Sequence, residues 1–215
     1  NNKKVINIKS KTKKMIFIHG KKTLSPININ VPNDPSSAAF FTALTLLQKK
    51  SSIKIKNVGL NQTRIGFYQL LKKHGAKIKF KNIKKKNNEQ RADIYVKSCK
   101  IKPIKASKNF YVNSTDEYPI LFVIASLTKG ISVFNGIKDL ANKESNRIIE
   151  MQKILKQIGI KTIASNNKIK IFGSYNFELH KKSVLVPNLG DHRICMSTFI
   201  LALLTGAKTK INNFE

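Results

Sequence analysis

Three stretches of the chain are almost wholly apolar over the length of a helix, and each begins with polar residues. They cover residues 34–51, 116–130 and 191–206, and each is followed by a strand-like run of alternating apolar positions. A helix that is apolar on every side must be surrounded by protein. The pattern therefore predicts three buried helices at nearly even intervals, which indicates an internal repeat.

A second, amphipathic helix follows in the first two units, over residues 64–74 and 146–158. Each ends just before a glycine, Gly75 or Gly159, and glycine suits the left-handed position that ends a helix. Two further strand-like runs close each of these units. The predicted repeat is strand, helix, strand, helix, strand, strand, or βαβαββ.

The buried first helices favour a packing in which the helices lie inside and the sheets outside. The predicted fold class is α/β (α+β), an inside-out, barrel-type domain of βαβαββ repeats that is incomplete at both ends. Residues 1–32 contain strand-like runs at 5–8 and 15–18 and are expected to close a preceding domain. Residues 33–215 are then the next domain without its final segment.

Composition makes the chain globular, with 41% hydrophobic residues among 215, and strongly basic, with a formal net charge of +30. Of its 41 basic residues only four are arginine, and lysines occur in every segment. A nucleic-acid protein would use more arginine for phosphate and guanine contacts and would interleave aromatic residues. The charge therefore indicates a solvated lysine surface that favours anionic metabolites, with a nucleic-acid-binding module as the minor alternative.

The cysteines and the apolar runs indicate in which compartment the protein works and whether it holds a metal or crosses a membrane. Cys99 and Cys195 do not form a disulfide framework, and no Cys/His cluster has zinc spacing. The longest apolar runs are shorter than the roughly 20 residues of a membrane helix, and no signal peptide opens the chain. We expect a cytoplasmic protein without a structural metal or a membrane span.

The residues before the second amphipathic helix are the best candidate site. Ser145 is predicted to cap that helix, and its amino end would favour an anion held by Lys143 and Arg147. A guanidinium fork suits a carboxylate or phosphate, and Glu144 beside two cations is a candidate proton carrier. The alternative is a surface capping box with solvated charges.

Charged residues also stand at the starts of the three buried helices. They are Asp34, Asp116, and the pair Asp191 and Arg193. Taken alone, each aspartate fits a helix cap as well as it fits a substrate site. We give His192 no chemical role. Because helix starts in packed repeats converge, we expect these groups to meet Glu144 and Arg147 at one end of the domain.

These motifs resemble the 3-phosphoshikimate 1-carboxyvinyltransferase (EPSP synthase) family. The most specific are Lys-Glu-Ser-Asn-Arg at 143–147 and Asp-His-Arg at 191–193, and their order and separations follow the family. Further matches lie at residues 31–41, 57–64 and 116–119. Asn33 replaces a glycine that is usual in the family, and Asn146 replaces an aspartate.

The resemblance implies two inside-out domains that close on substrates, with residues 1–32 as the tail of the N-terminal domain. It implies that Asp116 contacts the 5-hydroxyl of shikimate 3-phosphate and accepts its proton, and that Glu144 is the second acid/base group. It also implies that Lys143 binds shikimate 3-phosphate, that Arg147 and Arg193 bind phosphoenolpyruvate, and that Asp34 and Asp191 support the site.

The implied reaction transfers the enolpyruvyl group to that hydroxyl and releases phosphate, without a metal or cofactor. The family's remaining substrate ligands have no counterpart here, so the chain alone is expected to be inactive and the full-length protein to be a monomer. A UDP-N-acetylglucosamine enolpyruvyl transferase of the same fold is the nearest enzyme alternative.

Overall fold

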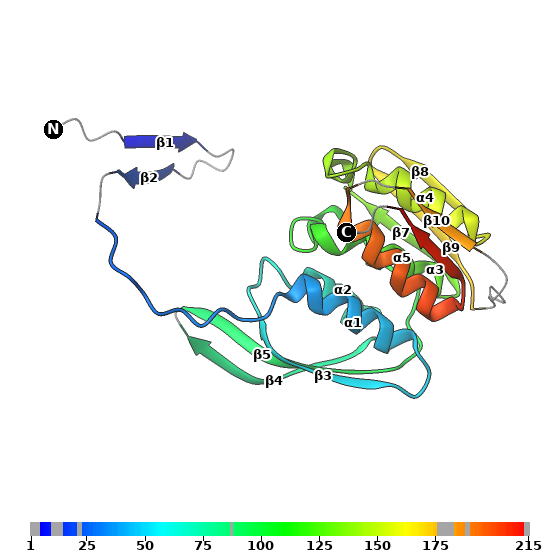
Figure 1. The fold of residues 1–215 in the computed structure, drawn as a ribbon, viewed down its shortest axis with the longest axis horizontal. Coiled ribbons are helices and arrows are strands. Elements are labelled where there is room, and N and C mark those ends of the chain that lie inside the picture. Colours follow the sequence, from blue (N-terminus) through cyan, green and yellow to red (C-terminus); the bar gives the residue numbers. More distant parts are fainter. Residues whose placement is uncertain are drawn as a thin grey trace. The chain divides into compact units, whose positions relative to one another are not determined.

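The chain forms two compact units in the computed structural model, residues 1–31 and 32–215 (Figure 1). The structure describes residues 5–9, 15–20, 23–86, 88–175, 183–187 and 190–212. In the first unit, β1 (Val5–Lys9) and β2 (Met15–His19) pair as antiparallel strands. Both strand-like runs predicted there are confirmed, while residues 1–4, 10–14 and 21–22 of this segment lie outside the described residues.

The first repeat of the second unit has a three-stranded antiparallel sheet in the order β3-β5-β4. Its elements are α1 (Pro35–Leu47), β3 (Ser52–Gly59), α2 (Gly66–Lys73), β4 (Lys77–Lys86) and β5 (Glu89–Lys97). Ahead of α1, Asn33 forms a parallel bridge with Val58, so the expected first strand is reduced to one bridge.

The second repeat is complete and has a four-stranded sheet in the order β6-β7-β9-β8, in which only β6 and β7 are parallel. Its regular elements are β6 (Lys105–Ala106), α3 (Tyr118–Ser126), β7 (Gly130–Asn135), α4 (Arg147–Gln157), β8 (Thr162–Ser165) and β9 (Lys168–Gly173). Three short 3₁₀ turns are η1 (Lys108–Phe110), η2 (Thr115–Glu117) and η3 (Lys138–Asn142). The predicted βαβαββ order is confirmed here.

The third repeat contains β10 (Ser183–Val186), α5 (His192–Thr205) and β11 (Lys208–Ile211). Strands β10 and β11 are parallel, which is the relation that β6 and β7 have around α3. The third repeat therefore shares the first strand, helix and second strand of the second repeat. The strand-like run predicted after this helix is confirmed as β11, and residues 213–215 lie outside the described residues.

The buried helices lie inside and the sheets outside, as predicted. Helices α1, α3 and α5 pack against one another, and all nine residues of α3 are buried. On their outer sides, α1 packs on β3 and β5, α3 packs on β9, and α5 packs on β10 and β11 (Figure 1). Within the described residues, no helix is long and apolar enough to cross a bilayer.

The ends of the helices follow the residues that the sequence marked. Asp34 and Asp191 cap α1 and α5, since their side chains accept hydrogen bonds from backbone N–H groups in the first turn. Gly75 and Gly159 follow α2 and α4 with φ of 94° and 84°, which only glycine adopts without strain. The caps at Asp34 and Asp191 set the starts of α1 and α5, and α5 carries Arg193 of the candidate site.

His74 at the end of α2 joins the first repeat to the second. Its Nε2 accepts a hydrogen bond from the backbone N–H of Lys105 (2.9 Å), so the ring proton is assigned to Nδ1, which donates to the carbonyl of Leu70 (2.8 Å). Replacing His74 with leucine leaves these two backbone groups without partners and is expected to lower the free energy of unfolding by about 1–3 kcal/mol. Urea denaturation measures this loss, and His192→Leu at an exposed histidine should cost far less. Equal losses in both variants would contradict the linking role of His74.

Candidate active site

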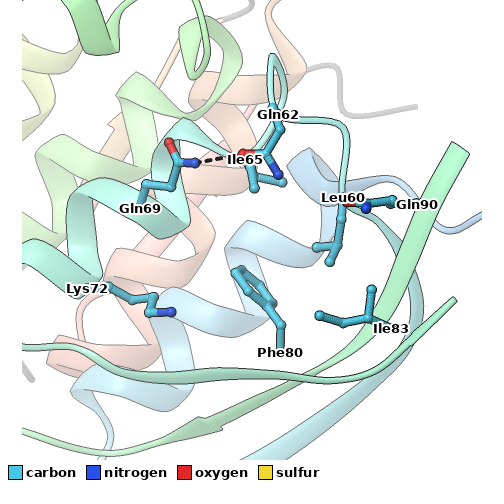
Figure 2. Close-up of a pocket in the computed structure, with 8 residues that line it drawn as sticks. All are labelled: Leu60, Gln62, Ile65, Gln69, Lys72, Phe80, Ile83 and Gln90. Carbon is cyan, nitrogen blue, oxygen red and sulfur yellow. Dashed lines mark hydrogen bonds between the residues drawn. The ribbon is translucent and has the colours of Figure 1, made fainter. Parts of the chain in front are cut away.

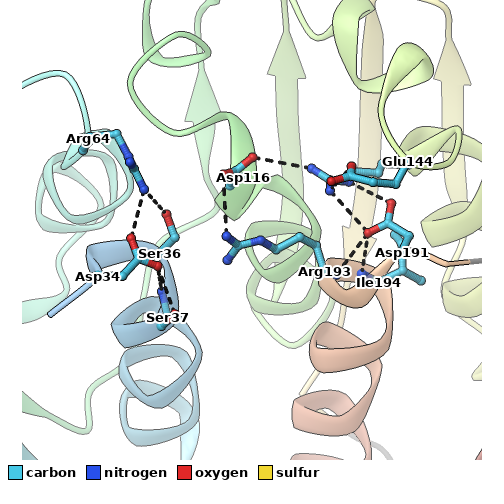
Figure 3. Close-up of polar contacts among 10 residues, drawn as sticks. Asp34, Ser36, Ser37, Arg64, Asp116, Glu144, Asp191, Arg193 and Ile194 are labelled. Atoms are coloured by element: carbon cyan, nitrogen blue, oxygen red, sulfur yellow. Dashed lines mark hydrogen bonds and ion pairs between the residues drawn. The ribbon is translucent and has the colours of Figure 1, made fainter. Parts of the chain in front are cut away.

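Asp116 lies on η2, immediately before the fully buried α3, and its side chain is 43% exposed. Its two carboxylate oxygens face two different arginines (Figure 3). Oδ1 is 3.7 Å from Nη1 of Arg147, and Oδ2 is 3.6 Å from Nη2 of Arg193. These distances are ion-pair rather than hydrogen-bond distances, so a ligand can compete for the arginines.

Arg147 is the first residue of α4, and only 1% of its side chain is exposed. Its Nε donates to Oδ2 of Asp191 (2.9 Å) and its Nη2 to Oε2 of Glu144 (2.5 Å). Among the described residues, Nη1 has no hydrogen-bond partner. An unsatisfied buried donor costs about 1–3 kcal/mol, so this guanidinium is prepared to bind an acceptor beside Asp116.

Asp191 holds this arginine in place, with a side chain that is wholly buried. It also accepts hydrogen bonds from the hydroxyl of Ser145 (2.8 Å) and from the backbone N–H groups of Arg193 and Ile194 (3.0 and 3.3 Å). Burial alone would raise the pKa of Asp191, but the hydrogen bonds from Arg147 and Ser145 and the charge of Arg147 outweigh it, so the pKa is lowered. Asp191 is therefore an ionised support for Arg147.

The prediction that Ser145 caps α4 is wrong. Asn146 is the cap, because its side chain accepts from the backbone N–H of Ile149 (3.2 Å). Asparagine caps a helix as well as aspartate does, so the departure from the family at this position leaves α4 intact. Asn33 is accommodated as well, since it bonds to the backbone of β3 in extended conformation and needs no glycine-like angle.

Glu144 lies on the exposed side of the site, and the exposed Lys143 precedes it in the chain. The side chain of Glu144 is 46% exposed even though it pairs with Arg147, which leaves one carboxylate edge accessible. Lys143 is exposed and forms no ion pair within the described part of the chain. The proton-transfer role of Glu144 and the substrate-binding role of Lys143 remain predictions.

Asp34 is set slightly apart from this group and pairs with Arg64, a residue for which the sequence predicted no role (Figure 3). The Oδ1 of Asp34 is 2.9 Å from Nη2 of Arg64, which also donates to the hydroxyl of Ser36 (3.1 Å). Burial raises the pKa of Asp34, and hydrogen bonds from Ser37 and Ser36 together with the charge of Arg64 lower it more. In a chain that uses lysine almost everywhere, the presence of an arginine near a helix start was the signal that could have pointed to Arg64.

The structure thus brings together Asp116, Glu144, Arg147, Asp191 and Arg193 from the starts of α3, α4 and α5. Two arginines for an anion lie beside two partly exposed carboxylates for proton transfer. Within the described residues, no group of three or more His, Cys, Asp or Glu side chains is arranged to hold a metal ion. The site is suited to a small anionic substrate whose reaction moves protons.

A separate pocket of about 410 Å³ lies beside α2 and β4 (Figure 2). It is lined by Leu60, Gln62, Ile65, Gln69, Lys72, Phe80, Ile83 and Gln90. None of these is a candidate site residue, so the pocket is not part of the candidate active site.

The inside-out arrangement of helices and sheets is the fold of the enolpyruvyl transferases. The enolpyruvyl transferase NikO from Streptomyces tendae matches 97% of this chain with a TM-score of 0.63 at 13% identity, a likeness of fold alone, and 45% of that chain is covered. The EPSP synthase from Acinetobacter baumannii matches 98% of this chain with a TM-score of 0.80 at 31% identity, and 47% of that structure is covered.

The family model for EPSP synthase (3-phosphoshikimate 1-carboxyvinyltransferase) matches residues 2–215, and the chain belongs to this family. The 3-phosphoshikimate 1-carboxyvinyltransferases of Zymomonas mobilis and Persephonella marina are each 36% identical to it, over 93% and 98% of this chain. The matches cover 45% and 48% of those relatives. The chain therefore spans about half the length of the curated relatives, and the predicted fold and family are confirmed.

Proposed function

We propose that this chain carries about half of an EPSP synthase active site, which transfers the enolpyruvyl group of phosphoenolpyruvate to the 5-hydroxyl of shikimate 3-phosphate. The observation that carries the proposal is Asp116 placed between Arg147 and Arg193, where the buried Nη1 of Arg147 has no hydrogen-bond acceptor in the part of the chain that the structure describes. Family membership supports the choice of substrates. We also propose that residues 33–215 act as the C-terminal domain of a monomeric, cytoplasmic enzyme and that residues 1–32 end its N-terminal domain.

In the proposed reaction, Arg147 and Arg193 bind phosphoenolpyruvate and Lys143 binds shikimate 3-phosphate. Asp116 accepts the proton of the 5-hydroxyl as the hydroxyl oxygen adds to C2 of phosphoenolpyruvate. Glu144, in its protonated form, donates a proton to C3 of the same molecule. The C2–O bond to phosphate then breaks, the leaving phosphate takes up the proton held by Asp116, and Glu144 takes a proton back from C3, which restores the double bond. The arginines stabilise the negative charge of the phosphoenolpyruvate groups throughout.

The direct test is an assay of phosphate release by the protein expressed from its complete reading frame. We expect phosphate with phosphoenolpyruvate plus shikimate 3-phosphate and none with UDP-N-acetylglucosamine as acceptor. Arg193→Ala should lower kcat/KM by roughly 10²–10³-fold, because one arginine facing the anion is lost. Lys208→Ala, at an exposed lysine on β11, is the matched control and should have wild-type activity.

Two results would reject the proposal. Release of phosphate only with the UDP-sugar would favour the alternative enolpyruvyl transferase. Absence of activity together with steeply salt-dependent binding to mixed-sequence nucleic acid, unaffected by Arg193→Ala, would favour the lysine-rich binding module.

A further inference from the structure

The pocket beside α2 and β4 is formed where the strand β4 is interrupted. In a regular strand, residues three apart point to opposite faces, yet Phe80 and Ile83 of β4 both line the pocket. The register of β4 against β5 shifts between Lys81 and Lys84, so β4 contains an extra residue there. This β-bulge turns Ile83 to the same side as Phe80 and completes one wall of the pocket (Figure 2).

A carboxylate on the neighbouring strand holds this bulge in place. Asn82, inside the bulge, has a left-handed φ of 55°, and its Nδ2 donates to Oδ2 of Asp93 on β5 (2.9 Å). The Oδ1 of Asp93 accepts from the backbone N–H of Asn57 (3.1 Å), which has a φ of 53° in a second bulge, on β3. Asparagine adopts this conformation more readily than most residues. One side chain thus fixes both bulges, and the wall made by Phe80 and Ile83 is a built feature of the fold.

The pocket has the size and the apolar wall of a small-molecule site. Its volume of about 410 Å³ falls in the range of about 300–1,000 Å³ that is usual for such sites. Leu60 and Ile65 face it from the loop before α2, and Phe80 supplies an aromatic ring. Ile83 is 58% exposed although it is apolar. A flat apolar ligand would cover this side chain and contact the ring of Phe80.

The polar groups of the pocket favour an acceptor with negative charge. Among the described residues that line it, Lys72 alone is charged, and none of the ion pairs there includes it. The Nζ of Lys72 lies 5.1 Å from the centre of the Phe80 ring, and Figure 2 shows Phe80 between Lys72 and Ile83. Gln69 donates to Oε1 of Gln62 (3.1 Å), so the NH₂ group of Gln62 is left as a donor.

We infer that this pocket binds a small aromatic carboxylate. The ring of the ligand lies against Phe80 and Ile83, and its carboxylate pairs with Lys72. An uncharged ring would leave the ammonium without an anion, and a small acid without a ring would leave the apolar wall uncovered. The inference goes beyond the proposed function and does not rest on it, because the pocket shares no residue with the candidate active site.

The experiment uses three probes on the protein expressed from its complete reading frame. They are 3-phenylpropionate, its uncharged analogue 3-phenylpropanol, and propionate, which has the acid without the ring. Ligand-observed NMR titrations measure each Kd. We expect saturable binding of 3-phenylpropionate and binding of each analogue that is weaker by roughly tenfold or more. Phosphoenolpyruvate and shikimate 3-phosphate should not displace the probe, since they bind elsewhere.

Variants of Lys72 test the charge. Lys72→Met keeps an aliphatic side chain and should raise the Kd of 3-phenylpropionate roughly tenfold. Lys73→Met is the matched control, because Lys73 is an exposed lysine on the same helix whose Nζ lies over Phe110 instead (5.9 Å), and it should leave the Kd unchanged. Lys72→Glu should reverse the preference, so that 3-phenylpropylamine binds better than the acid.

Ile83→Ser tests the apolar wall and should also raise the Kd roughly tenfold. Its control is Ile131→Ser, at an exposed isoleucine on β7 that does not line the pocket. Lys72 and Ile83 are both exposed, so the variants are expected to fold, and thermal melting checks this.

Four results would overturn the inference. They are the absence of saturable binding, displacement of the probe by the two substrates, equal Kd values for the three probes, and losses in the control variants as large as those in Lys72→Met and Ile83→Ser. Because the readout is binding rather than turnover, an inactive wild type would reject the proposed function and would leave this test intact.

Discussion

Replacing Asp191 with alanine is expected to lower the free energy of unfolding by about 3–5 kcal/mol, because it leaves the buried Arg147 without its main counter-charge. The substitution also removes the cap of α5 and the acceptor of the Ser145 hydroxyl. Asp191→Asn, which keeps a capping side chain but not the charge, should lose less than alanine and more than a surface variant. Urea denaturation of the protein in its full reading frame measures each loss.

The control for this prediction is Lys153→Ala on α4. The side chain of Lys153 is 64% exposed, although that of its partner Glu150 is 12% exposed, and an ion pair with a solvated lysine contributes far less than a buried pair. The loss in Asp191→Ala should also depend on pH. Since the pKa of Asp191 is lowered in the folded state, its stabilisation is present above the ordinary aspartate pKa of about 3.9 and disappears as pH falls below it. A loss no larger than that of Lys153→Ala, or one independent of pH, would contradict the support role of Asp191.

Sequence patterns predicted the order of the repeats because local signals and tertiary packing agree there. The helices that are apolar on every side became α1, α3 and α5, and two of them begin directly after predicted caps. Strand β10 was missed. Only Val184 and Val186 of its four residues are buried, and so short an alternation is indistinguishable from a loop. The parallel pairing with β11, which the local sequence does not encode, makes it a strand.

The members of the candidate site were easier to predict than their contacts. Because the helix starts of packed repeats converge, Asp116, Arg147 and Arg193 come together at one end of the domain. This holds for any rotamer that each side chain adopts. Ser145 and Asn146 both suit a cap, and one residue of difference in the helix start decides which of them meets a backbone N–H and which meets Asp191. Such one-residue choices depend on packing between repeats, so sequence alone left them open.

Asp116→Asn is expected to lower kcat by roughly 10²–10⁴-fold, the usual contribution of a general base. The carboxylate lies between Arg147 and Arg193 and is the group proposed to accept the proton of the attacking hydroxyl. Asparagine has nearly the same shape but cannot accept that proton. Steady-state phosphate release by the protein in its full reading frame measures the loss, and Asp139→Asn, at an exposed carboxylate on η3, should leave kcat unchanged.

The Michaelis constants of Asp116→Asn distinguish a general base from a residue that only binds the substrate hydroxyl. Asp116→Asn removes a negative charge that competes with the substrate for two arginines, so the KM for phosphoenolpyruvate should stay the same or fall while kcat collapses. A variant with normal kcat and a raised KM for shikimate 3-phosphate would instead mean that Asp116 binds the hydroxyl without taking its proton. In that event Glu144, the other partly exposed carboxylate at the site, becomes the residue to test as the base.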